Sequence, residues 1–307
     1  MSENAQHAQE YYSPVENLLI HSTHVKQTFK VQVMLPARKK QEVTRFPVVY
    51  VTDGNFAFDA LKSISYSIQT LERDSARFIL VGIGYPGESP NAGAMLRCRD
   101  MTFPGYPRMS MKPPPILGVP LAEEGTKDFD GAEDFKRFIA DELIPLIDEK
   151  YETVPGDRTY FGHSAGGGFG LYTLFTESEV FKNYIISSAA VLYHGKTSAG
   201  INYENYDFLL QDARQFIASK KSIGNTKVYM SVGTEEEFEP GLADWQLTSS
   251  FYRLAALMKA ASIPGLTLIA EALAGETHMT AWPGAFVRGV KAVFSTSTGA
   301  TPERRCI

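Results

Sequence analysis

The sequence contains very little cysteine and no excess of basic residues. Cys98 and Cys306 are its two cysteines in 307 residues, a count that excludes a disulfide framework and a zinc site built from cysteines. Lysine and arginine total 30 against 35 acidic residues, so the formal net charge is -5. No block of basic residues is present to neutralise a phosphate backbone. We therefore expect no nucleic-acid partner.

Long hydrophobic runs are also absent. The apolar runs, such as 46–51 and 78–83, are far shorter than the about 20 residues that span a bilayer. The first twelve residues are polar and include Glu3, His7 and Glu10, where a secretory leader needs a basic start followed by an apolar stretch. We expect a soluble cytoplasmic protein that does not insert into a membrane.

The composition that is present is that of a globular protein, with 44% hydrophobic and 21% charged residues. Short runs rich in β-branched and aromatic residues recur with stretches of helical periodicity between them, which is typical of a parallel sheet with crossover helices. Most runs are continuously hydrophobic, as buried parallel strands are. The predicted strands are 17–22, 28–35, 46–52, 77–82, 157–161, 183–188, 227–232 and 266–270.

Three stretches show helical periodicity. The clearest, 130–151, places its apolar residues on one face, and Pro145 inside it should kink the helix. Stretches 244–261 and 281–294 repeat the pattern less cleanly. Segment 104–127, after the fourth strand, is rich in methionine and proline, and a loop of that length is usually functional or mobile.

These elements predict the α/β class: a mostly parallel eight-stranded sheet flanked by helices, with a long loop insertion after strand four. We expect one domain over 1–307, in which 104–127 forms a lid-like insertion. The ends, 1–15 and 296–307, are expected to be flexible.

A serine stands in a tight turn between a predicted strand and a helical run. The segment 162–168 reads Gly-His-Ser-Ala-Gly-Gly-Gly, which matches G-x-S-x-G in the setting where that motif functions. Glycines two residues before and after Ser164 leave room for a strained backbone, because a β-carbon there would collide with the neighbouring strand or helix. The turn directs the first amides of the helix at a forming negative charge. We predict that Ser164 is a nucleophile; the alternative is a glycine-rich turn with an idle serine.

A serine nucleophile needs a base, and the base needs an orienting acid. With this kind of turn, both follow the serine in the chain, the acid first and then a histidine. His278, after the last predicted strand, is the predicted base. His163 is expected to pack against the sheet. His194, after the sixth strand, either lines a pocket or lies on a solvent-exposed loop.

Three adjacent glutamates begin at the carboxyl end of the strand 227–232, where catalytic groups of open α/β sheets collect. We predict that Glu236, third after Gly233, is the acid, with Glu235 and Glu237 as alternatives. Glutamate can replace aspartate in this role, which is to accept the ring hydrogen bond of the histidine. Three glutamates in a row are otherwise typical of a solvated surface.

Two backbone amides are needed to hold the oxyanion. We assign one to Ala165, which follows the nucleophile, and one to Asn55, in the loop after the third strand. Gly54 in that loop would let the backbone turn inward. The alternative for Asp53-Gly54 is a plain turn.

Between about residues 31 and 294, the chain resembles the putative-esterase branch of the α/β-hydrolases. That branch includes esterase D, S-formylglutathione hydrolases, and siderophore, feruloyl and acetylxylan esterases. The most specific similarity lies in 135–167, while 97–104 is similar to the family's Arg-x-Arg-Asp-x-Thr-x-Pro, and 275–278 matches its Gly-Glu-x-His. The resemblance implies an α/β-hydrolase fold and places the family's serine, acid, histidine and second oxyanion amide on Ser164, Glu236, His278 and Asn55.

The function that follows is a serine carboxylic-ester hydrolase that acts on a small-molecule ester through an acyl-enzyme, with no cofactor and no metal. An acyltransferase with the same triad and a non-catalytic binding protein on the hydrolase fold are the alternatives. Siderophore-type members tend to show Ser-Pro-Ser and then Trp after the sixth strand, where this chain has Ser188, Ala189 and Ala190. That departure argues against a trilactone substrate.

Four residues are candidates for substrate binding. Arg99 either pairs with a carboxylate or phenolate of the substrate or forms an internal ion pair with Asp100. Met109 and Met111, in the predicted lid, would supply an adaptable apolar wall. His194 is the fourth candidate.

Overall fold

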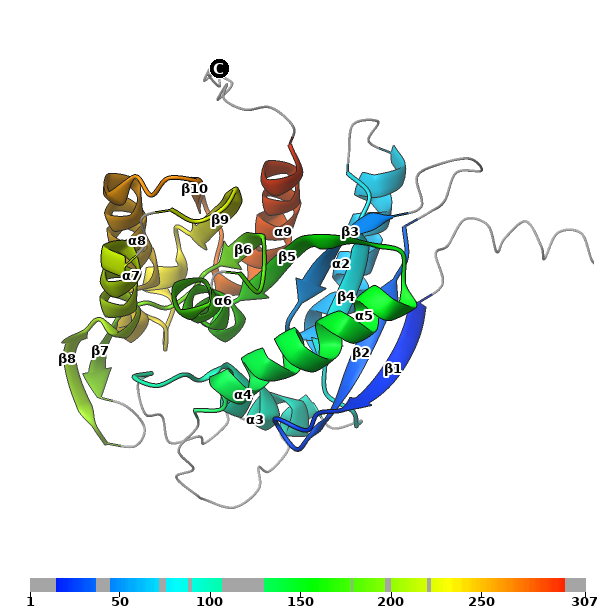
Figure 1. Cartoon of the computed structure of the whole chain (residues 1–307). Helices are drawn as coiled ribbons and strands as arrows, with labels where there is room; N and C mark the ends of the chain where they lie inside the picture. Colours follow the sequence, from blue (N-terminus) through cyan, green and yellow to red (C-terminus); the bar gives the residue numbers. More distant parts are fainter. Residues whose placement is uncertain are drawn as a thin grey trace, which may run out of the picture.

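The computed structural model describes residues 15–36, 45–71, 76–87, 90–106, 130–177, 179–196, 200–219 and 222–295. Within these residues, eight strands form one sheet in the order β1-β2-β4-β3-β5-β6-β9-β10 (Figure 1). β2 is antiparallel to both β1 and β4, and every other neighbouring pair is parallel. The strands are β1 (Val15–His21), β2 (Thr28–Met34), β3 (Phe46–Val51), β4 (Ile79–Gly84), β5 (Thr153–His163), β6 (Asn183–Ser187), β9 (Thr226–Gly233) and β10 (Leu266–Leu273).

All eight predicted strands are present, and the prediction of a mostly parallel sheet is confirmed. The ends differ by a few residues, most clearly in β5, which begins at Thr153 rather than at 157. A separate antiparallel pair, β7 (Tyr193–Lys196) and β8 (Asn202–Tyr206), was not expected. β7 is short and carries Gly195, and β8 contains two asparagines, so neither has the β-branched pattern on which strand prediction depends.

The predicted lid lies largely outside the described residues, since the structure gives no account of 107–129. The predicted flexible ends also fall outside them, except for Val15, which begins β1. In the part of the chain that the structure describes, no helix has the length and apolar composition to cross a membrane.

Helices cover both faces of the sheet (Figure 1). They are α2 (Gly54–Leu71), α3 (Pro90–Met101), α4 (Ala132–Arg137), η2 (Phe138–Leu143), α5 (Ile144–Lys150), α6 (Ala165–Thr176), α7 (Phe208–Ser219), η3 (Glu236–Phe238), η4 (Ala243–Trp245), α8 (Leu247–Ala261) and α9 (His278–Phe294). Helices α2, α3 and α7 were not predicted. α9 begins three residues earlier than expected, so His278 is its first residue rather than part of the preceding loop.

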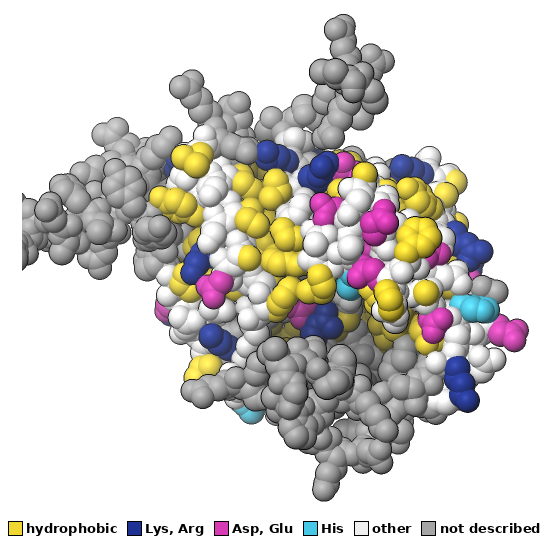
Figure 2. Space-filling view, turned by 180° about the vertical axis from the view of Figure 1, so that it is seen from behind, with side chains coloured by type: hydrophobic (Ala, Val, Ile, Leu, Met, Phe, Trp, Pro, Cys, Tyr) yellow, Lys and Arg dark blue, Asp and Glu magenta, His cyan; other side chains and the backbone are white. Residues whose placement is uncertain are grey.

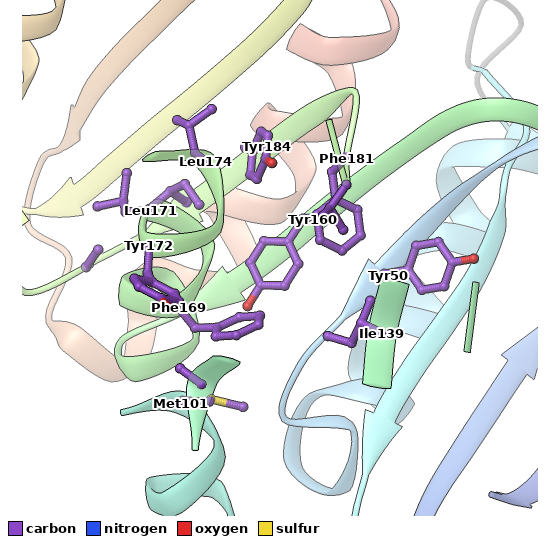
Figure 3. Close-up of a cluster of buried hydrophobic side chains, with 14 of the residues drawn as sticks. Tyr50, Met101, Ile139, Tyr160, Phe169, Leu171, Tyr172, Leu174, Phe181 and Tyr184 are labelled. Atoms are coloured by element: carbon purple, nitrogen blue, oxygen red, sulfur yellow. The ribbon is translucent and has the colours of Figure 1, made fainter. Parts of the chain in front are cut away.

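Two hydrophobic cores form because successive strand residues point to opposite faces. Tyr50 and Tyr160 belong to the larger core, with residues of α4 to α8. Val51 and Phe161, each one position further on, belong to the smaller core, with residues of α2 and α9. Figure 3 shows the larger core, in which Tyr160 lies beside Phe169 of α6.

Pro145 interrupts the predicted helix 130–151 in a specific way. The residues before it form the π-helix η2, in which the Ile144 amide donates to the carbonyl of Ile139, five residues earlier. A proline offers no amide hydrogen and its ring crowds the carbonyl four residues back, so regular α-helical bonding cannot pass through this point. The expected interruption is therefore taken up by a π-helical segment.

Candidate active site

Ser164 lies at the turn between β5 and α6 in a strained conformation, with φ 59° and ψ -120°. The flanking glycines make this turn possible. A β-carbon on Gly162 would lie 2.3 Å from the carbonyl oxygen of Gly166, and one on Gly166 would lie 2.5 Å from Oγ1 of Thr52. The structure would therefore produce the collisions that the sequence predicted for a side chain at either position.

Hydrogen bonds fix the turn in place. The Ser164 amide donates to the carbonyl of Ser187 at the end of β6 (2.9 Å). The hydroxyl of Tyr160 donates to the carbonyl of Gly166 (2.7 Å). Ala165 is the first residue of α6, and amides of a first helical turn have no carbonyl partner within the helix. The Ala165 amide is thus placed beside Ser164, where the sequence predicted an oxyanion donor.

Glu236 and His278 are in direct contact. Nδ1 of His278 lies 2.8 Å from Oε2 of Glu236, whose side chain is fully buried. The other carboxylate oxygen, Oε1, accepts hydrogen bonds from the Gly233 amide and from Oγ of Ser188, both at 2.6 Å. Ser188 is therefore a partner of the acid that sequence reasoning missed.

The other two glutamates point elsewhere. Glu235 is exposed and accepts a hydrogen bond from its neighbour Thr234. Glu237 accepts from the amide and the hydroxyl of Ser249, both at 2.8 Å, and so caps the first turn of α8. Of the three glutamates, the structure brings the predicted Glu236 to His278, and not the alternatives Glu235 and Glu237.

The backbone of His278 is held as firmly as its ring. Its amide donates to Oε1 of Glu239 (2.6 Å), and Thr277 caps α9 through a reciprocal pair with Thr280. Glu239 lies three residues after Glu236, so one short segment supplies carboxylates to both the side chain and the main chain of His278. Glu239 was not singled out from the sequence.

His163 contacts the neighbouring strand β6, as expected, and its ring also faces His278. The two ring centroids are 4.5 Å apart. Nδ1 of His163 contacts Oγ of Ser187 at 3.0 Å, and its buried Nε2 has no hydrogen-bond partner among the described residues. Burial, together with the charges of His278 and Arg97, lowers the pKa of His163 well below its ordinary value, so this ring is neutral.

The loop after β3 leads into α2 as expected, but its geometry differs. The positive φ falls on Asp53 (61°) and not on Gly54. A glycine is needed at 54 because the chain passes close to β4 there: a β-carbon would lie 3.0 Å from the backbone of Ile83. Asn55 is the second residue of α2, so its amide also belongs to a first helical turn.

Asp53 forms a two-pronged ion pair with Arg97. Nε of Arg97 contacts one carboxylate oxygen of Asp53, and Nη2 lies 3.1 Å from the other. The same guanidinium reaches the carbonyl of His163, the residue before Ser164, at 3.5 Å. Arg97 therefore ties the loop that carries Asn55 to the turn that carries Ser164. Sequence reasoning noted the segments of both residues but did not predict that Asp53 and Arg97 pair.

Arg99 forms the internal ion pair with Asp100, one of the two alternatives predicted for it. Its Nε lies 2.6 Å from Oδ1 of the fully buried Asp100, which also accepts a hydrogen bond from the Tyr85 hydroxyl (3.0 Å). Nη2 of Arg99 is buried and has no hydrogen-bond partner in the described ranges. A role for Arg99 in substrate recognition stays a prediction.

The other three substrate-binding candidates are His194, Met109 and Met111. His194 lies in β7 and is exposed. Of its two predicted positions, in a pocket or facing solvent, the structure shows the second. Met109 and Met111 lie outside the described residues. In the described part of the chain, no group of three or more His, Cys, Asp or Glu side chains could hold a metal ion.

Three exposed apolar side chains lie next to predicted site residues in the sequence. Phe56, Phe238 and Met279 are 55%, 80% and 53% exposed, and each lies within two residues of Asn55, Glu236 or His278. The Phe56 ring packs 5.3 Å from Trp282 of α9. Figure 2 shows a face of the molecule on which hydrophobic side chains gather next to charged ones. Three exposed apolar side chains therefore lie close in the chain to predicted site residues.

The sheet order and the turn at Ser164 define the α/β-hydrolase class. The sequence profile of the family described as "Putative esterase" matches residues 116–293, more than half of the chain. The chain belongs to this family, as the resemblance indicated, and the prediction of a carboxylic ester hydrolase is confirmed.

Relatives and solved structures agree with that assignment. The ferri-bacillibactin esterase BesA of Bacillus subtilis is 29% identical over 242 residues, which cover 78% of this chain and 75% of that protein. The siderophore triacetylfusarinine C esterase of Aspergillus fumigatus is 25% identical over 222 residues, which cover 70% of this chain and 66% of that protein. The siderophore hydrolase EstA of Aspergillus nidulans has the same fold, with a TM-score of 0.72, 20% identity and coverage of 95% and 96%.

Proposed function

We propose that the chain hydrolyses esters through an acyl-enzyme formed on Ser164, with His278 as the base and Glu236 as its orienting acid. The observation that carries this proposal is the contact between the buried Glu236 carboxylate and Nδ1 of His278, on the same sheet edge as the strained Ser164. Because Nδ1 faces Glu236, Nε2 is the ring nitrogen left to take a proton. Glu236 fixes that tautomer and stabilises the imidazolium.

In the proposed reaction, Oγ of Ser164 attacks the ester carbonyl and its proton passes to Nε2 of His278. The tetrahedral oxyanion accepts hydrogen bonds from the amides of Ala165 and Asn55. The alkoxide leaves with the proton from His278, and the acyl group stays on Ser164. Water, deprotonated by His278, then releases the acid. An alcohol in place of water would give acyl transfer from the same intermediate.

For the substrate, we propose the ester bonds of a siderophore. The support is the names of the relatives, which describe esterases of bacillibactin, triacetylfusarinine C and enterobactin. The departure from the Ser-Pro-Ser pattern lies at 189–190, since Ser188 matches its first serine and bonds Glu236, and Ala189 packs beside Gly167. The siderophore proposal therefore rests on the names of the relatives and not on residues 189–190. The exposed Phe56, Phe238 and Met279, each within two residues of Asn55, Glu236 or His278, would suit contact with a bulky molecule.

Substitution of Ser164 tests the proposal. We expect Ser164→Ala to abolish hydrolysis of p-nitrophenyl acetate and of a siderophore ester, with a loss on the order of a millionfold in kcat and an unchanged fold by circular dichroism. Ser67→Ala, on the exposed face of α2, is the matched control and should keep full activity. A folded Ser164→Ala variant that turns over esters would remove Ser164 from the nucleophile role. Binding of the siderophore by wild type without turnover would favour the binding-protein alternative.

A further inference from the structure

We propose that the side chain of Asn55 is a positioning group that holds its own backbone amide in place as an oxyanion donor. This inference rests on the proposed function, because it assigns a task to a residue next to the reacting atoms. It concerns the side-chain amide, whereas the oxyanion contact itself is made by the main chain.

The side chain of Asn55 binds the backbone of one residue at both of its polar ends. Nδ2 donates to the carbonyl of Tyr85 (2.7 Å), and Oδ1 accepts from the Tyr85 amide (2.6 Å). Tyr85 directly follows β4, so the bridge joins the first turn of α2 to the end of that strand. A helix-capping role does not account for these bonds, since neither partner belongs to α2.

Tyr85 is itself a fixed anchor. Its side chain is buried, and its hydroxyl donates to Oδ2 of the fully buried Asp100 (3.0 Å). Asp100 is paired in turn with Arg99. The bridge from Asn55 therefore ends on a residue whose ring and hydroxyl are both held, and Asn55 has little freedom to move away from the strand.

Gly84 supplies the second half of the arrangement. A β-carbon on Gly84 would lie 2.4 Å from Oδ1 of Asn55 and 3.0 Å from its backbone nitrogen. The amide of Asn55 thus lies directly against the end of β4, with no side chain between them. Two independent features, the side-chain bridge and the bare strand end, fix the position of the same N–H group.

Loss of the bridge should weaken transition-state stabilisation more than substrate binding, because the oxyanion exists only after attack on the carbonyl. Removal of a whole oxyanion donor costs about a hundredfold to a thousandfold in kcat. A displaced donor should cost less. We expect Asn55→Ala to lower kcat by about tenfold to a hundredfold while KM for a short ester changes by less than about twofold.

The matched control lies at the other end of the same helix. Gln69 of α2 also accepts a backbone N–H beside β4, that of Phe78 (3.0 Å). Gln69→Ala should therefore cost stability, as Asn55→Ala does, but keep kcat within about twofold. A boronic acid, which forms a tetrahedral adduct with a nucleophilic serine, adds a second readout. Its inhibition constant should rise in Asn55→Ala in parallel with the loss of kcat, and stay unchanged in Gln69→Ala.

Gly84→Ala provides a variant that leaves the Asn55 side chain intact and displaces it by a new β-carbon at the end of β4. We expect the same pattern of reduced kcat, weaker boronate inhibition and a nearly constant KM. Gly93→Ala is its control, because a β-carbon there would make only an ordinary contact, 3.9 Å from the Tyr85 ring. If either Asn55→Ala or Gly84→Ala fails to fold, the other still decides the question.

Failure of this inference is distinguishable from failure of the proposed function. Full kcat and unchanged boronate inhibition in folded Asn55→Ala or Gly84→Ala, with Ser164→Ala inactive, would overturn the positioning role alone. A loss of kcat in Gln69→Ala equal to that in Asn55→Ala would also overturn it, because the effect would then reflect general loosening of α2. Activity in Ser164→Ala would overturn the function on which both rest.

Discussion

Asp53, Ser164 and Ser188 are non-glycine residues with positive φ, at 61°, 59° and 51°. They follow the carboxyl ends of β3, β5 and β6, which are neighbours in the sheet. Such a conformation costs about 1–3 kcal/mol and persists where the surroundings hold it. Here Arg97 holds Asp53 and Glu236 holds Ser188. Three of the six non-glycine residues with positive φ in the described ranges therefore lie at the edge of the sheet where the candidate site lies.

Single-residue assignments were predictable where a local motif or chain order carried them. Ser164 followed from its glycine-flanked turn, and His278 followed from its position after the last strand. The roles of Ser188, Arg97 and His163 could not be predicted in this way. Their partners lie 48, 44 and 115 positions away in the chain, a separation that only the folded sheet brings to contact.

The neutral state of His163 predicts how stability depends on pH. Its pKa is lowered in the folded protein, so below about pH 6.5 the unfolded chain binds a proton that the folded chain does not. Stability is lost as pH falls. Between pH 7.5 and 5.5, this one group should therefore lower the unfolding free energy. Urea unfolding at both pH values should show that His163→Asn loses less stability than wild type, and equal losses would contradict the neutral state of His163.

The short helix η3 shows how one element gives adjacent, identical residues different tasks. Glu235, Glu236 and Glu237 point to solvent, to His278 and to the first turn of α8, respectively. A 3₁₀-type turn rotates each residue by about a third of a circle, so three neighbours face three directions. The sequence predicted Glu236 with its two neighbours as alternatives, and this turn explains why Glu236 is the one that meets His278.

Three matched variants test that selection. In Glu236→Gln, an amide nitrogen replaces an acceptor for the ring hydrogen of His278 and favours the wrong tautomer, so kcat should fall by up to about ten-thousandfold. Glu237→Gln should keep activity and lose about 0.5–1 kcal/mol, because it weakens the charge at the start of α8. Glu235→Gln should change neither kcat nor stability. Steady-state kinetics and thermal unfolding of the three proteins decide the matter; the largest kinetic loss in Glu235→Gln or Glu237→Gln would contradict the assignment.

Element prediction succeeded where periodicity was strong. The strands of the sheet are continuous apolar runs, and 130–151 is a clear helical face, so both were found. Helix α2 buries Ser65 and Gln69 among its apolar residues, which weakens its pattern. Helix α9 begins with polar residues, and its true start depends on the Thr277–Thr280 cap rather than on periodicity.

At the scale of the whole molecule, the sheet order explains why distant residues meet. β3, β5, β6 and β9 are neighbours and parallel, so their carboxyl ends share one edge. Asn55, Ser164, Ser188 and Glu236 each follow one of these ends. The fold class could be predicted from alternating strands and helices, and the edge from general rules for open α/β sheets. The contacts within that edge required the folded structure.

The central claim is that ester cleavage passes through an acyl group on Ser164, and intact-mass measurement of the protein during turnover tests it most directly. Wild type mixed with p-nitrophenyl acetate and quenched in acid within the first turnover should gain the mass of one acetyl group. Peptide mapping should place that group on Ser164, and Ser164→Ala should gain nothing. Steady release of p-nitrophenol with no adduct, or with the adduct on another residue, would contradict the account.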